Sequence, residues 1–201
     1  MTDEQRKAAR ALASRLNTAL FAVFALWLAA LVLFWTRMGG PLRPYDALPF
    51  AAEPLPWLVA SMAGAFAVRL LPDAWFRIGS QERAMRTYEL FGVKIARFVI
   101  TDGDLVNRFV RRRYPGYRVD AGEEPLAARL ATGIVGERAH LGFLIFGLGS
   151  AACALAGGWA GWAIGLTLGN LAVNFYPVLL QRYTRARVHR ILARRTPAAA
   201  R

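Results

Sequence analysis

The chain has 201 residues, of which 56% are hydrophobic, and it carries a formal charge of +13. Soluble chains this basic usually bind nucleic acid and are less apolar, so the composition argues against a soluble nucleic-acid-binding domain. Apolar and basic residues occupy separate segments here, which predicts an all-α integral membrane protein. The single cysteine, Cys153, lies in an apolar run and excludes both an intrachain disulfide and a cysteine metal cluster.

Two apolar segments precede the basic middle of the chain. Residues 18–35 are uncharged, and a bilayer takes about 20 apolar residues in helical form. This run is longer than a signal-peptide core and no clear cleavage site follows it, so we expect a retained helix. Residues 55–71 are a shorter candidate that starts beside Pro54 and Pro56, with Arg69 near an end where it can reach the interface.

The strongest apolar signal is residues 141–180, forty positions without a charged side chain. That length is enough for two spans with a tight turn between them. Gly157 and Gly158 supply the turn, and Trp159 and Trp162 lie where an interfacial aromatic belt is expected. We therefore predict a helical hairpin here and about four transmembrane helices in the whole chain.

Basic residues set the predicted orientation. Residues 72–139, between the second and third spans, contain 12 Arg or Lys, and the part after Leu180 contains seven. The positive-inside rule then places both termini and the central segment in the cytoplasm, with the chain as a multi-pass protein of the inner (plasma) membrane. The expected regions are 1–71 with two spans, 72–139 as a basic cytoplasmic or interfacial segment, and 140–201 as the hairpin and basic tail.

Short helices are predicted within this basic segment at residues 81–90 and 105–113. Residues 93–100 alternate weakly, and residues 101–104 have the composition of a turn. The run Arg111–Arg113 favours a solvated face on anionic lipid headgroups. Binding of an anionic acyl donor is a sharper alternative, and nucleic acid is the least favoured because no binding fold accompanies the charge.

Several polar residues fall at the edges of the last two spans or inside them. A helix beginning at Pro125 is expected to run into the third span, which puts Glu137 and His140 on one face at the membrane boundary. In the fourth span the spacing predicts a polar stripe, followed by a basic helix over residues 184–195; the stripe consists of Asn170, Asn174 and Gln181. Because consecutive spans are adjacent, four of these groups are expected to line one cleft open to cytoplasm and lipid: Glu137, His140, Asn174 and Gln181.

Histidine beside a carboxylate suits the deprotonation of an alcohol. The alternative is that Glu137 pairs with Arg138 or another arginine and that His140 only anchors the interface; spacing leaves both open. Glu-x-x-His also occurs as a ligand pair in di-iron bundles, which need a second such pair. The other histidine, His189, follows Ala186 by three residues, so no metal site is expected.

Four short motifs, in order between about Leu71 and Ile191, resemble the glycosyl-4,4'-diaponeurosporenoate acyltransferase family. They are Leu71–Phe76, the basic stretch Gly92–Gly103, the sequence Glu137–His140, and Asn174 with Gln181–Arg187 after it. The chain departs from the family pattern at four places. Leu141 stands for Trp, Thr184 for Asn and Ala186 for Pro, and the proline of the last motif is shifted to Pro177.

The resemblance implies a small membrane enzyme that attaches a fatty acyl chain to the sugar of a glycosylated carotenoid acid. We therefore expect an acyltransferase acting on this or a similar lipid at the cytoplasmic leaflet. Its expected partners are membrane lipids, the glycolipid acceptor and an acyl thioester co-substrate, without a further cofactor and without nucleic acid. A non-catalytic membrane scaffold that binds anionic lipid, or another small polytopic lipid-modifying enzyme, are the alternatives.

Chemistry suggests a role for each matched position. His140 is the expected general base, oriented by Glu137, which also stabilises the imidazolium. Amide side chains would hold the acceptor or donate to the developing oxyanion, and cationic ones would bind the phosphate of the donor. The predicted substrate-binding residues are Asn174, Gln181, Arg182, Tyr183, Lys94, Arg97 and Asp102.

Overall fold

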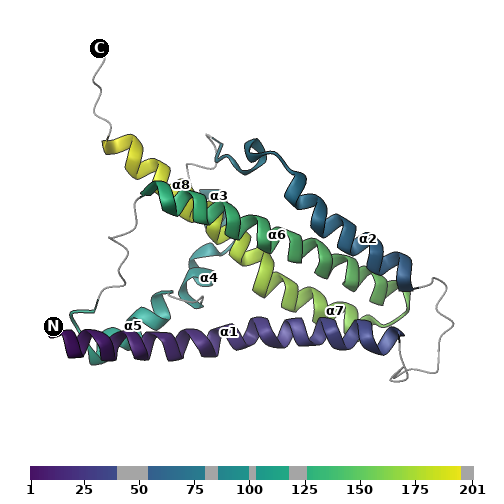
Figure 1. Ribbon diagram of the computed structural model, residues 1–201, viewed down its shortest axis with the longest axis horizontal. Helices are drawn as coiled ribbons and strands as arrows, with labels where there is room; N and C mark the ends of the chain where they lie inside the picture. The colour runs from purple at the N-terminus through teal and green to yellow at the C-terminus, as the bar shows by residue number, and fades with distance from the viewer. Residues whose placement is uncertain (40–53, 80–85, 100–102, 118–125, 196–201) are drawn as a thin grey trace, which may run out of the picture. The chain divides into compact units, whose positions relative to one another are not determined.

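The computed structural model describes residues 1–39, 54–79, 86–99, 103–117 and 126–195, and every regular element within these ranges is helical (Figure 1). Asp102 and Pro125 lie outside the described residues. The predicted all-α class is therefore confirmed for the described part of the chain. The elements are α1 (Asp3–Gly39), α2 (Pro54–Ala67), the 3-10 turns η1 (Val68–Leu70) and η2 (Asp73–Phe76), α3 (Arg86–Leu90), α4 (Val93–Val99), α5 (Asp104–Arg113), α6 (Leu126–Ala156), α7 (Ala160–Asn170), the π-helical turn η4 (Leu171–Phe175) and α8 (Tyr176–Arg195).

Three of these helices are long and apolar enough to cross a membrane, judged by length and composition. They are α1, α6 and the continuous helix from α7 through α8. The predicted second span is the shorter apolar helix Pro54–Leu70, which joins α2 to η1. The chain thus has the helices of a membrane protein, with three rather than four of full spanning length among the described residues.

The described residues divide into two compact units. The first unit takes its residues from Met1–Val23, Ile78–Ile134 and Leu179–Arg201. The second unit takes them from Phe24–Arg77 and Val135–Val178. Most of the apolar spans therefore belong to the second unit, and the short helices of the basic segment belong to the first.

Aromatic and small side chains form the core of the second unit. Trp27, Leu31 and Phe34 of α1 pack with Ala151 and other small residues from α6 and α7. Two indole groups find acceptors here: the buried Trp27 donates from Nε1 to the Leu166 carbonyl at 3.4 Å, and the partly buried Trp35 donates from Nε1 to Ser150 Oγ at 3.0 Å. The outer faces remain apolar, because the exposed large side chains include Val59, Phe66, Leu155, Ile164 and Leu168. Such surfaces suit contact with lipid rather than water.

Glycines bring α2 close to α6. A Cβ atom on Gly142 would lie 3.2 Å from the Ala65 carbonyl oxygen, and one on Gly64 would lie 3.0 Å from the Ile145 side chain. Gly149 faces Ser61 in the same way. Small residues at these positions let the two backbones approach, which is how helices associate in lipid. The short helix α2 is therefore an integral part of this unit.

The hairpin between α6 and α7 forms where the sequence predicts it. Gly158 has a φ of +76°, a left-handed conformation that only glycine adopts readily. The amide of Gly157 donates to the Cys153 carbonyl at 3.0 Å, and that of Trp159 donates to the Ala154 carbonyl at 2.8 Å, so the end of α6 is capped. Figure 1 shows α6 and α7 running back alongside each other from this turn.

The first unit packs the short helices against longer ones. Val106 and Val110 of α5 are buried with Ala9 and Ala13 of α1. Residues 93–100, whose alternation was weak, contain the helix α4. Gly92, with a φ of +73°, provides the turn into that helix from α3.

Candidate functional site

The continuous helix from α7 through α8 contains a π-helical turn, η4. Over Leu171–Phe175 the backbone widens, and the amide of Tyr176 bonds to the Leu171 carbonyl five residues back. Pro177 has no backbone N–H, so it cannot donate to the Val173 carbonyl as an α-helix requires. We attribute the π turn to this proline. Such turns occur often at functional sites.

The predicted polar stripe crosses this π turn. Asn174 lies inside the turn, Asn170 precedes it and Gln181 follows it. A π turn has more residues per turn than an α-helix. Sequence spacing alone therefore does not predict which face of the helix the residues after the turn lie on. The step of four residues is nevertheless kept, because Asn174 and Asn170 bond to each other, and the facing of Gln181 stays a prediction.

A chain of hydrogen bonds connects the predicted base with both asparagines. The His140 Nδ1 atom lies 3.3 Å from Asn174 Oδ1. Asn174 Nδ2 donates to Asn170 Oδ1 at 2.8 Å, and Asn170 Nδ2 donates to the Leu144 carbonyl at 2.9 Å. The structure thus brings His140 and Asn174 together, as predicted, and adds Asn170, the first residue of the predicted stripe.

Burial differs along this chain of hydrogen bonds. Both asparagine side chains are fully buried, whereas His140 is only partly buried. Glu137 precedes His140 by one turn of α6 and is 1% exposed. The partner at His140 Nδ1 is the amide oxygen of Asn174, the position in which a carboxylate was expected. A His–Asn pair is a known alternative to His–Asp in nucleophilic enzymes.

Arg138 connects η2 to α6. Its Nη2 atom donates to the Leu71 carbonyl at 3.1 Å and to Asp73 Oδ1 at 2.5 Å. The guanidinium also lies over the buried ring of Phe76, 4.7 Å from the ring centroid. The guanidinium of Arg138 therefore binds the segment Leu71–Phe76. The alternative weighed from the sequence had paired Arg138 with Glu137.

Replacing Arg138 with Lys is expected to lower the stability of the protein by about 1–2 kcal/mol, because lysine keeps the charge but loses the planar fork and the stacking on Phe76. Asp73 is largely exposed, so the ion pair itself contributes little. The measurement is the thermal unfolding midpoint in detergent, with exposed Arg187→Lys as the matched control. Equal midpoints for the two variants would show that the contacts of Arg138 are energetically neutral.

The two side chains of the basic segment that were predicted to bind phosphate, Lys94 and Arg97, have carboxylate partners. Lys94 Nζ lies 3.0 Å from Glu89 Oε2. Arg97 donates to Asp104 Oδ2 through Nε at 3.0 Å and through Nη2 at 2.7 Å. Both pairs are exposed enough to exchange with solvent. Their binding of a donor phosphate stays a prediction.

The three residues Gln181, Arg182 and Tyr183, at the start of the basic tail, differ in burial. Tyr183 is buried, and its ring meets the ring of Tyr88 edge-on at 6.3 Å in the core of the first unit. Gln181 and Arg182 are partly buried. The geometry of Tyr183 is that of a packing residue, and the substrate-binding roles of all three stay predictions.

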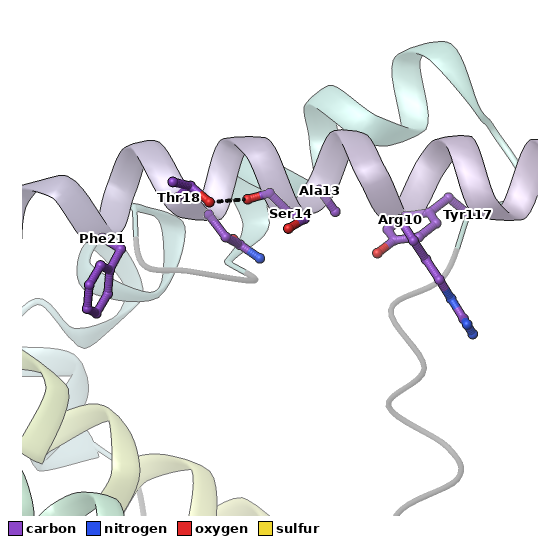
Figure 2. Close-up of a pocket in the computed structure, with 7 residues that line it drawn as sticks. Arg10, Ala13, Ser14, Thr18, Phe21 and Tyr117 are labelled. Carbon is purple, nitrogen blue, oxygen red and sulfur yellow. Dashed lines mark hydrogen bonds between the residues drawn. The ribbon is translucent and has the colours of Figure 1, made fainter.

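The first unit also carries an open hollow on the N-terminal half of α1 (Figure 2). Its volume is about 470 Å³, and Thr18 in its wall donates from Oγ1 to the Ser14 carbonyl at 3.0 Å. It contains none of the predicted site residues; the lining residues are Arg10, Ala13, Ser14, Asn17, Thr18, Phe21 and Tyr117. Among the described residues there is no group of three or more histidine, cysteine or acidic side chains able to hold a metal ion.

Comparison with known proteins gives one family. The sequence profile of the glycosyl-4,4'-diaponeurosporenoate acyltransferases matches residues 72–194, more than half of the chain. The chain belongs to this family. The matched part of this family member includes η2, His140 and both asparagines, and it leaves α1 and α2 outside. Searches of curated proteins and of solved structures find no significant match.

Two features around the site gave no clear signal in the sequence. Asp73 and Phe76 stood in a matched motif, but their bonding to Arg138 depends on folding. Gly147 gave no signal in the sequence, yet a Cβ atom there would come within 2.6 Å of the Asn170 amide. An apolar glycine in a span facing a polar residue of the next span is the pattern that would have indicated it.

Proposed function

We propose that this protein transfers a fatty acyl chain from an acyl thioester to a sugar hydroxyl of a glycosylated carotenoid or similar lipid. The observation that carries the proposal is the His140–Asn174 pair inside the part of the chain that matches the family. A partly buried imidazole held by a buried amide has the arrangement of a general base. The proposed location is the cytoplasmic leaflet, where the positive-inside rule places Glu137 and His140.

The chemistry requires one base and one leaving group. His140 Nε2 takes the proton of the sugar hydroxyl while the hydroxyl oxygen attacks the carbonyl carbon of the thioester. The tetrahedral intermediate collapses, its C–S bond breaks, and the sulfur leaves with the electron pair. The imidazolium returns the proton to the thiolate, so the products are an ester and a free thiol. Glu137, on the same face of α6, would favour the imidazolium electrostatically.

Arg182 is our first choice for binding an anionic donor, because it lies in a matched motif near the predicted membrane boundary. Arginine binds phosphate through two parallel hydrogen bonds. Lys94 and Arg97 are further candidates, and each would exchange its carboxylate partner, Glu89 or Asp104, for the donor phosphate.

Four membrane spans remain part of the proposal, with both termini in the cytoplasm. The helix Pro54–Leu70 is about 25 Å long at 1.5 Å per residue, somewhat less than the hydrocarbon thickness of about 30 Å. Local thinning of the bilayer accommodates a mismatch of this size. The close packing of α2 on α6 and its exposed Val59 and Phe66 support a span rather than a surface helix.

The test is mass spectrometry of lipid and pigment extracts from cells that make a glycosylated carotenoid acid, with and without this protein. We expect a product heavier by one acyl group, formed only when the protein is present. A parallel extract from cells that make other glycolipids tests the width of the acceptor class. If no acylated lipid appears in either strain although the protein is in the membrane, the acyltransferase proposal fails and a scaffold role is favoured.

A further inference from the structure

The chain of hydrogen bonds that starts at His140 ends on a backbone carbonyl. Because a carbonyl only accepts, it determines which group donates at every step of the chain. The Leu144 carbonyl can only accept, so the atom of Asn170 that faces it at 2.9 Å must be the amino group. The oxygen of Asn170 then faces Asn174, whose amino group donates to it at 2.8 Å. This leaves the oxygen of Asn174 facing His140 Nδ1.

An amide oxygen cannot donate, so a hydrogen bond at this position requires a proton on His140 Nδ1. In neutral imidazole the other nitrogen, Nε2, then carries the lone pair. The direction is therefore transmitted from Leu144 through two side chains to the ring. Each step follows from the number of donors and acceptors on the groups involved.

The surroundings make the reversed direction costly. Asn170 and Asn174 are each 0% exposed and lie within a candidate membrane span, where water is not available to correct a mismatch. Turning either amide would place two donors or two acceptors face to face. A buried polar group without a partner costs about 1–3 kcal/mol, which is enough to select one arrangement.

The backbone is shaped to hold these two amides. Gly147 on α6 leaves the space that the Asn170 side chain occupies, because a Cβ there would approach its amide atoms to 2.6–2.7 Å. The π turn Leu171–Phe175 contains Asn174 and sets its facing toward α6. Both features bring the asparagines to the histidine-bearing helix.

We propose that Asn170 and Asn174 are positioning residues that hold His140 in the Nδ1–H tautomer, with the lone pair on Nε2 available as the base. The catalytic importance of this tautomer rests on the proposed function; the tautomer itself does not. This assigns Asn174 a role on the protein side of His140 in place of the predicted contact with substrate. It also makes Asn170, which no family motif marks, part of the working site.

The test is ¹⁵N NMR of protein labelled at histidine, in detergent and without substrate. The chain has two histidines, so His189→Gln leaves His140 as the single signal. We expect the unmodified site to show a protonated Nδ1 and an unprotonated Nε2. An Nε2–H tautomer in this protein would overturn the proposal without the need for any further variant.

Two variants and one control extend the test. In Asn174→Leu and Asn170→Leu the constraint is removed, so the ring should exchange between tautomers or favour Nε2–H. Ser150→Ala removes another buried polar group of α6, bonded to Trp35, and should leave the tautomer unchanged. If both asparagine variants keep the Nδ1–H tautomer, or if Ser150→Ala shifts it equally, the two asparagines do not set it.

Turnover provides a second readout that a purely structural role would not give. We expect Asn170→Leu to lower kcat about 10- to 100-fold with KM nearly unchanged, since a misplaced base affects the transition state and not binding. An inactive protein with the expected tautomer would count against the proposed function alone. An active protein with the other tautomer would count against the positioning role alone.

Discussion

His140→Ala is expected to lower the rate of acyl transfer by about 10²- to 10⁴-fold, the usual contribution of a positioned general base. Without the imidazole, the sugar hydroxyl has to attack while still carrying its proton. The measurement is the initial rate of acylated lipid formation in membranes that contain equal amounts of protein. His140→Gln is a second variant that keeps hydrogen bonding but cannot accept a proton at neutral pH.

The matched control for this experiment is His189→Ala. His189 lies on α8 in the first unit and outside the hydrogen-bonded chain of His140, so its loss should leave the rate within about twofold, as for substitutions away from a site. Equal losses in both variants would indicate a general effect on the protein. An unchanged rate in His140→Ala, with normal insertion, would remove His140 from the mechanism.

Gly147→Ala is expected to lower turnover by about 10²-fold although it adds a single methyl group. The new Cβ would meet the Asn170 amide at 2.6 Å, closer than real contacts allow, so the amide must move. Displacing a catalytic arrangement by about 1 Å is known to cost this much. The measurement is kcat in detergent or vesicles, together with the unfolding midpoint.

The control is Gly165→Ala on α7, where a Cβ would meet nothing within 4 Å. Both changes raise helix propensity equally, by about 0.5–1 kcal/mol, so this contribution cancels in the comparison. The double variant Gly147→Ala with Asn170→Ala should be no worse than Asn170→Ala alone, because the clash has been removed. If the two losses add fully, Gly147 does not act through Asn170.

Much of the fold could be predicted because its signals are local. The hairpin over 141–180 follows from an uncharged run interrupted by Gly157 and Gly158, and the structure has its turn there. The family could also be identified, since the motif around His140 and the one starting at Asn174 occur in order. Hydropathy and residue spacing determine these features, whatever the tertiary packing.

The contacts of the site could not be predicted in the same way. Helical spacing places Glu137 and His140 on one face, but it does not say which group of a neighbouring helix meets that face. Thus Asn174 occupies the place expected for a carboxylate at His140 Nδ1, and Arg138 bonds to Asp73. Lys94 and Arg97, predicted to bind phosphate, are paired with Glu89 and Asp104.

By itself, then, the sequence determined a helical membrane protein of the acyltransferase family and the polar residues in its last two apolar helices. Only the tertiary structure decided which of those residues contact one another. Pro177 is visible in the sequence, but the π turn by which the backbone adapts to it is not. Gly147 becomes significant only when Asn170 lies against it. The reason is physical: hydrophobic patterns act along one helix, whereas hydrogen-bond direction and close packing are properties of two helices in contact.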